Sequence, residues 1–171
     1  LENFHSNKKI SKEKLKELYE RNKKVFVKEF KSLQFSELTP QNLTGSKEYN
    51  EAFFKKLDDI ENKVLDGQSF DESVKENSLK IVVINKINSK KEDQNNKKIE
   101  NIFNNFFKKI FLIKKEKTPE IIKVDNKYFL SEIKSIEIDN KPMNDPDVLE
   151  ALNAQLSFQI KIENNTSILK D

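Results

Sequence analysis

The spacing of apolar residues between positions 53 and 87 predicts two helices and a strand in close succession. In the first part of this stretch, apolar side chains recur at intervals of four, three and four residues, at Phe53, Leu57, Ile60 and Val64. This period places them on one face of a helix. Gly67 stands where that helix should end, because glycine enters the left-handed region without the penalty that a Cβ atom brings.

The second helix and the strand are predicted from a cap and from a change of period. Ser69, with Glu72 three residues later, has the form of a capping box, in which each side chain bonds the backbone N–H of the other residue. After Asn77 the helical period stops. The β-branched run at residues 80–84 then predicts a buried strand.

One helix and one strand are expected ahead of this stretch. Ser11 is the expected N-cap of a helix. The apolar stripe of that helix consists of Leu15, Leu18, Tyr19, Asn22 and Phe26. Residues 30–38 then alternate, which is typical of a strand with one face buried. The alternating residues are Leu33 and Phe35 on one face, and Ser32, Gln34 and Ser36 on the other.

A strongly apolar helix is predicted in the second half of the chain. Its stripe is formed by Ile99, Ile102, Phe103, Phe106 and Ile110. Phe107 and Phe111 lie toward the edge of this stripe, so we expect them to be its more exposed members. We interpret the phenylalanines as core rather than as a binding slot, because core packing is the usual role of such a stripe.

A hairpin and a last helix complete the chain. Asp125 and Asn126 tolerate positive φ and predict a two-residue turn between strands at residues 120–124 and 127–138. Asp145 and Pro146 then cap and open a helix. The stripe of this helix consists of Val148, Leu149, Leu152, Leu156, Gln159 and Ile160. Because isolated helices of this length are marginal in water, the first and last helices should pack on each other or on a neighbour.

The order of these elements predicts an α+β fold. A β-α-α-β-α-β-β unit, with a small and mostly antiparallel sheet of about four strands, is flanked by N- and C-terminal helices. We divide the chain into a helical lead-in at residues 1–28, the β-α-α-β-α-β-β domain at 29–139, and a C-terminal helix and tail at 140–171. The chain begins at Leu1 rather than Met, so we expect it to belong to a longer protein.

Charge and composition reduce the number of possible partners. Charged residues make up 36% of the chain, but acidic and basic residues are interleaved throughout and the net charge is only +3. Arg21 is the only arginine, so the bidentate contacts that read phosphate or guanine are nearly absent. We therefore expect no nucleic-acid partner. No run of about 18 apolar residues occurs, so no membrane-spanning segment is predicted.

The sequence offers no catalytic constellation or cofactor motif. With no cysteine, disulfides, thiolate catalysis and cysteine zinc sites are excluded. Asp58, Asp59 and Glu61 could suggest a metal site, but with no histidine nearby they are better explained as a solvated helix face. There is no nucleophile–base pair, phosphate loop or dinucleotide fingerprint. We therefore expect no cofactor, no metal and no catalytic residue.

Three segments resemble a known family when taken in their order. Residues 10–23 resemble the helix that leads into a parvulin domain, residues 60–72 resemble the helix junction of that domain, and residues 125–133 resemble its final hairpin. The chain thus resembles a parvulin-type domain with the flanking helices of a PpiD/SurA-type periplasmic folding factor. The resemblance covers about residues 10–162. It is greatest to the second, divergent parvulin-like module of PpiD-like chains.

The resemblance implies a degenerate substrate pocket. Gln34 and Phe129 fall where active parvulins carry two histidines, and Ile99 and Phe103 fall at a Met and a Phe position. These four residues are the expected substrate-binding set. His5, the only histidine, lies in the lead-in and cannot replace either one. The apolar half of the pocket would therefore remain while its polar half is lost.

The function implied by the resemblance is that of a catalytically silent chaperone or scaffold module. Its partners would be unfolded or partly folded polypeptides, and its location periplasmic, with a parent protein anchored in the inner membrane as one arrangement. The first alternative is an active peptidyl-prolyl cis-trans isomerase with a rearranged pocket. The second is an oligomerisation or docking module that uses a sheet edge or the terminal helices, which could form a homodimer.

Overall fold

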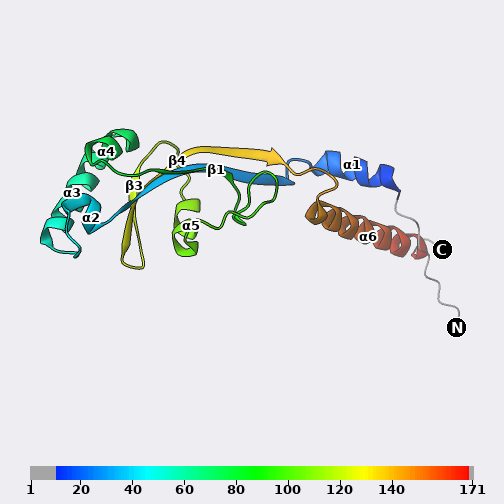
Figure 1. Ribbon diagram of the computed structural model, residues 1–171. Coiled ribbons are helices and arrows are strands. Elements are labelled where there is room, and N and C mark those ends of the chain that lie inside the picture. Colours follow the sequence, from blue (N-terminus) through cyan, green and yellow to red (C-terminus); the bar gives the residue numbers. More distant parts are fainter. Residues whose placement is uncertain (1–10, 170–171) are drawn as a thin grey trace. The chain divides into compact units, whose positions relative to one another are not determined.

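The computed structural model describes residues 11–169, which form an α+β fold with a small four-stranded antiparallel sheet and, in that range, six helices (Figure 1). Most of the predicted elements are confirmed, and the short helix α2 is additional. In chain order the elements are α1 (Lys12–Asn22), β1 (Val27–Leu38), α2 (Pro40–Thr44), α3 (Glu51–Leu65), α4 (Phe70–Glu76), β2 (Val82–Ile87), α5 (Asn104–Phe111), β3 (Glu120–Val124), β4 (Lys127–Asn140) and α6 (Pro146–Ile168).

The chain divides into two compact units, which we describe separately. One unit is Glu29–Ile138, and the other consists of the described parts of Leu1–Lys28 and Asp139–Asp171. The first unit contains most of the sheet with α2 to α5, and the second contains α1 and α6.

The sheet has the strand order β2-β1-β4-β3, so β1 and β4 are central and β2 and β3 are the edges. β1 pairs antiparallel with β2, with Gln34 opposite Val83, and β3 pairs antiparallel with β4. The predicted turn between β3 and β4 is confirmed. Asp125 and Asn126 have φ values of 48° and 63°, as a two-residue turn of the type I′ class requires.

Each face of the sheet carries its own apolar core. Side chains alternate across a strand, so Phe35 and Phe129 go to one face and Leu38 and Leu130 to the other. We call these the α5 face and the α3 face. The α5-face core comprises Leu33, Phe35, Ile84, Ile87, Ile102, Phe106, Phe107, Ile110, Ile122, Val124, Phe129 and Ile133. The α3-face core comprises Leu38, Phe53, Leu57, Ile60, Phe70, Val74, Leu79 and Leu130.

Two strand predictions need correction. β1 is not half buried: Ser32, Gln34 and Ser36 are buried like Leu33, because side chains and chain segments cover both faces of this central strand. The opposite holds for β2, which was expected to be fully buried. Val82 and Val83 are 39% and 46% exposed, because β2 is an edge strand.

The start of α5 also differs from the prediction. The helix begins at Asn104, and Phe103 is its N-cap with extended backbone dihedrals. Ile99 and Phe103 therefore precede the helix instead of lying on its apolar stripe. Phe107, expected at the exposed edge of that stripe, is only 4% exposed, whereas Phe103 is 57% exposed.

The junction between α3 and α4 has the local chemistry that its sequence predicts. Gly67 follows the C-cap of α3 with a φ of 101°, and its N–H donates to the Val64 carbonyl while that of Gln68 donates to the Lys63 carbonyl. This is the Schellman arrangement. Ser69 and Glu72 form the predicted capping box at the start of α4.

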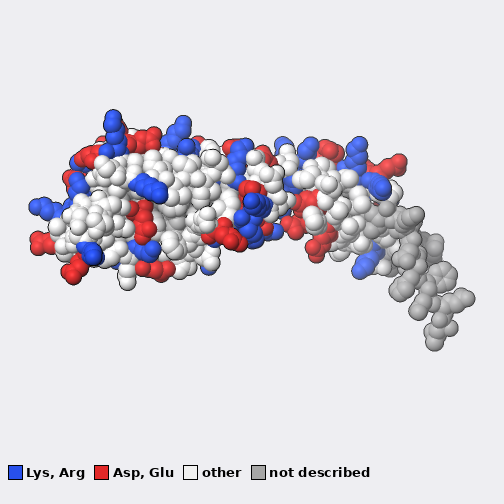
Figure 2. All heavy atoms as spheres, viewed as in Figure 1, with Lys and Arg blue, Asp and Glu red and all other residues white. Residues whose placement is uncertain are grey.

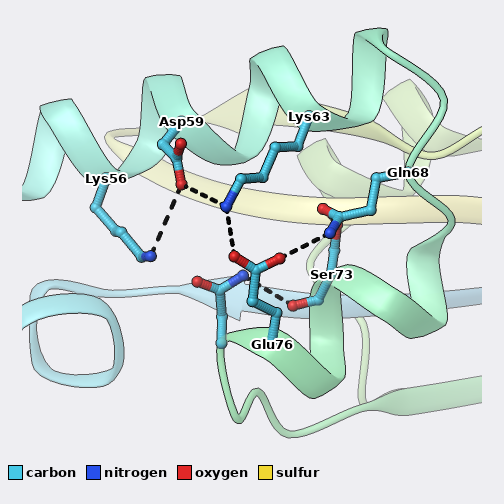
Figure 3. A network of polar contacts seen from close by, with 7 residues as sticks. Lys56, Asp59, Lys63, Gln68, Ser73 and Glu76 are labelled. Carbon is cyan, nitrogen blue, oxygen red and sulfur yellow. Dashed lines mark hydrogen bonds and ion pairs between the residues drawn. The ribbon is translucent and has the colours of Figure 1, made fainter.

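A polar network joins α3 to α4 across this junction (Figure 3). The Lys63 ammonium lies 3.1 Å from an Asp59 carboxylate oxygen and also pairs with Glu76, whose other oxygen accepts from the Gln68 amide at 2.7 Å. The hydrogen bonds from Lys63 and Gln68 lower the pKa of the Glu76 carboxyl. Hydrogen bonds to Glu76 and Asp59 raise the pKa of Lys63.

The terminal helices pack on each other, as predicted. Leu18 and Tyr19 of α1 are buried against α6, and the Tyr19 hydroxyl donates to the Lys141 carbonyl at 2.7 Å. The residues of α6 in this core are Val148, Leu152 and Leu156. Each amphipathic helix therefore covers the apolar stripe of the other.

Gly67→Ala is expected to destabilise the protein through backbone strain alone. A Cβ atom at this position would meet no atom within 4 Å, but the φ of 101° is unfavourable for an L side chain. We expect the free energy of unfolding, measured with urea, to fall by about 1–2 kcal/mol. Gly67→Asn should lose less, because asparagine visits this region more readily. Equal losses in the two variants would contradict this explanation.

Glu76→Gln should reduce the dependence of stability on acid pH. The pKa of Glu76 is lowered below its ordinary value of 4.5, so folding favours the carboxylate. That contribution is present above pH 4.5 and is lost as the pH falls through the folded-state value. The melting temperature of the native protein should therefore exceed that of the variant at neutral pH, and the difference should shrink below pH 4.5. Glu61→Gln, at an exposed position of the neighbouring helix α3, makes the same change in charge outside the network and is the control.

Candidate functional site

The candidate site is an open groove between the start of α5 and the hairpin of β3 and β4. Its volume is about 390 Å³. We call it the Phe129 groove, after the β4 residue at its base. It is lined by Phe103, Asn104, Asn105, Phe106, Val124, Asp125, Lys127 and Phe129.

The floor of the Phe129 groove is a cluster of aromatic rings. The rings of Phe106 and Phe129 have centroids 4.3 Å apart, and Phe35 packs against both from β1, at 4.7 Å and 6.1 Å. All three rings are 7% exposed or less. Aromatic contacts of this kind are stabilising beyond the area they bury, so the floor is a rigid part of the α5-face core.

Phe103 forms an exposed wall above this floor. Its ring lies 6.4 Å from that of Phe129, and the Lys127 ammonium lies 4.4 Å from the centre of the Phe103 ring. Lys127 also pairs with Glu37 at 3.2 Å. A cation over an aromatic face is attracted by the ring quadrupole, so Lys127 helps to hold Phe103 at the mouth of the groove.

The rim of the groove is polar. The Asn105 side chain donates to the Asp125 carboxylate at 2.8 Å, which joins the first turn of α5 to the hairpin turn. Phe103, as N-cap, makes no side-chain hydrogen bond to the first-turn amides. The amides at a helix start have no partner within the helix, so they can meet a ligand carbonyl or water.

The structure brings together two of the four residues that the sequence assigned to the pocket. Phe103 and Phe129 line the groove. Ile99 is partly buried against the α5-face core, and its N–H donates to the Lys91 carbonyl at 2.8 Å. Gln34 lies on the other face of the sheet, where its amide donates to the buried Glu132 carboxylate at 2.6 Å.

The β1 residue that packs beneath the groove, against the rings of Phe106 and Phe129, is Phe35. Successive side chains of a strand point to opposite faces, so an assignment shifted by one residue selects the wrong face. The alternation already placed Phe35 with Leu33 and apart from Gln34. That signal was sufficient to find Phe35. Lys127 was missed because no local pattern distinguishes it from the many other lysines.

Neither a cluster of metal-ligand side chains nor a membrane-spanning helix occurs among the residues that the structure describes. In residues 11–169 no three His, Cys, Asp or Glu side chains gather as a ligand set. No helix in that range is both long and apolar enough to span a bilayer. His5, the only histidine, lies outside the described residues.

Comparisons of the chain with protein-family models, curated proteins and solved structures give no match. The function is therefore argued from the Phe129 groove itself.

Replacing Phe106 and Phe103 in turn should show that the groove floor contributes much more to stability than the exposed wall does. Phe106 is fully buried, so Phe106→Ala should lower the free energy of unfolding by about 3–5 kcal/mol. Phe103 is more than half exposed, so Phe103→Ala should change it by only about 0.5–1 kcal/mol. Urea unfolding measures both values. A similar large loss in the two variants would show that Phe103 is core rather than wall.

Proposed function

We propose that this chain is a catalytically silent, parvulin-like module of a periplasmic folding factor, and that it binds unfolded or partly folded polypeptides in the Phe129 groove. The observation that carries the proposal is the exposed Phe103 ring beside a buried aromatic floor. An exposed apolar side chain that borders an apolar groove, as Phe103 does, marks a candidate binding surface.

The chemistry of the groove suits an extended segment with one apolar side chain. The rings of Phe103 and Phe129 can cover a proline or a small aliphatic group, while the polar rim faces the peptide backbone. Asn104 and Asn105 supply amide donors and acceptors at the helix start. Such contacts do not depend on one particular sequence, as a factor that binds many clients requires.

Catalytic silence is proposed from the residues that form the groove. Proline isomerisation is accelerated when the amide is desolvated and twisted, because resonance is then lost. The Phe129 groove is open to solvent along Phe103, and its eight lining residues include no histidine. By the resemblance of the sequence to parvulins, Phe129 stands at a position where the active members carry a histidine. An active isomerase with a rearranged pocket remains the rival proposal.

A second candidate function, self-association, is favoured by an exposed stripe on α6. Phe158 and Ile162 are 64% and 49% exposed and lie one turn apart, away from the face that packs on α1. A homodimer through this face would cover them. The molecular mass in solution over a range of concentrations tests it, and a strictly monomeric protein would remove this candidate.

The proposed function predicts binding without turnover. A labelled, permanently unfolded polypeptide that contains proline should bind the protein, and Phe103→Ala should weaken binding about fivefold or more, as the loss of one apolar anchor. A proline-containing tetrapeptide should isomerise near its uncatalysed rate, in tens to hundreds of seconds. Fluorescence anisotropy and a protease-coupled isomerisation assay measure the two quantities.

Two controls make this experiment decisive. Phe54→Ala removes an exposed phenylalanine of α3 that does not line the groove, so it should leave binding unchanged. A strong acceleration of isomerisation that disappears in Phe103→Ala would replace the proposal with the active isomerase. Absence of binding by both the native protein and Phe54→Ala would refute the polypeptide-binding function.

A further inference from the structure

A second hollow lies on the other side of the first turn of α5. Its volume is about 500 Å³, and we call it the lysine groove. It is bounded by the loop before α5, by the side of α5 and by the residue that ends the helix. Asn104 borders both grooves, but no other lining residue is shared.

The floor of the lysine groove is apolar. Phe107 and Phe111 lie one turn apart on α5, with ring centroids 5.3 Å apart. Leu112, the C-cap of α5, is 77% exposed at the edge of the groove. Phe111 is held from the sheet side by the buried Lys31, whose ammonium lies 4.7 Å from the ring centre. The floor can therefore receive an apolar side chain without rearranging.

The rim of this groove carries charge of one sign. Lys90, Lys91 and Lys108 contribute to the lining, and none of its eight residues is acidic. The Lys91 ammonium donates to the Ile102 carbonyl at 2.8 Å and to the Asn104 side-chain oxygen at 2.9 Å. Both acceptors are neutral, so these bonds fix the position of Lys91 and leave its positive charge uncompensated.

Charges of both signs are mixed elsewhere on the face that Figure 2 shows, where basic and acidic side chains lie close together. The net charge of the whole chain is only +3. The lysines that form salt bridges elsewhere, such as Lys63 and Lys127, have carboxylates within 3.2 Å. An apolar floor with Lys91 and Lys108 on its rim is complementary to a ligand that is both apolar and acidic.

We propose that the lysine groove binds a polypeptide segment in which an apolar side chain is flanked by aspartate or glutamate. The apolar side chain would lie on Phe107, Phe111 and Leu112, and the flanking carboxylates would face Lys91 and Lys108. A nucleic acid is less suited, because the groove contains no arginine and Phe107 is too buried to stack on a base. The site is separate from the Phe129 groove and does not depend on its function.

Charge-matched peptides test this proposal on the full chain. The probes are three fluorescein-labelled peptides of equal length with the same two leucines, flanked by glutamate, by glutamine or by lysine. The glutamate peptide should bind about threefold or more tightly than the glutamine peptide, and the lysine peptide should bind most weakly. Raised salt should reduce this difference, because the pairs are near the surface.

Charge reversal at one rim position should reverse the preference. Lys108 is exposed, so Lys108→Glu should fold normally, bind the glutamate peptide about threefold less tightly, and bind the lysine peptide more tightly. Lys55→Glu, an exposed lysine of α3, makes the same change in net charge away from the groove and is the control. Leu112→Ser should weaken all three peptides, because it removes apolar surface from the edge of the groove.

Three results would overturn the proposal. The first is equal affinity for the three peptides, and the second is an equal effect of Lys108→Glu and Lys55→Glu on peptide binding. The third is that Lys108→Glu leaves peptide binding unchanged and instead weakens binding to a labelled oligonucleotide or to a second copy of the chain. Phe103→Ala should leave the peptide preference intact, since Phe103 does not line this groove. Failure of the Phe129 groove and failure of the lysine groove are thereby separate outcomes.

Discussion

The packing of Phe35, Phe106 and Phe129 is the contact on which the unit Glu29–Ile138 depends. These three rings join the two central strands to α5, and each is 7% exposed or less. α5 is only eight residues long, and a helix of that length is not stable by itself in water. Its position on the sheet is therefore set by this burial. Both grooves are formed against α5, so their shape follows from the same contact.

The elements that the sequence predicted well are those decided by neighbouring residues. Gly67, the capping box of Ser69 and Glu72, and the turn at Asp125 and Asn126 depend on backbone conformations and hydrogen bonds within a few residues. The burial of whole strands depends instead on which strand lies beside which. Val82 and Val83 have the composition of a buried strand, yet they are exposed, because the strand order places β2 at an edge. That order is a nonlocal property, which period and propensity do not contain.

Two of the four residues predicted for the pocket line the groove, and the placement of the others again depends on more than local sequence. Phe103 and Phe129 were identified by their place in a motif, and both line the groove. Gln34 was assigned by the same kind of correspondence, but in a strand an error of one residue changes the face. The predicted conformation of Phe103 was wrong: its spacing fits a helical stripe, whereas the chain is still extended there. Because α5 starts only at Asn104, the residue after Phe103, the Phe103 ring forms an exposed wall beside the helix start.

Around α5, stability and recognition are assigned to different side chains. Phe106 and Ile110 are fully buried and hold the helix on the sheet, whereas Phe103, Lys108 and Leu112 face the grooves from exposed positions. Substitutions at buried positions change packing and hence folding, while those at exposed positions usually change stability little. Binding specificity on either side of the helix can therefore change without loss of the fold.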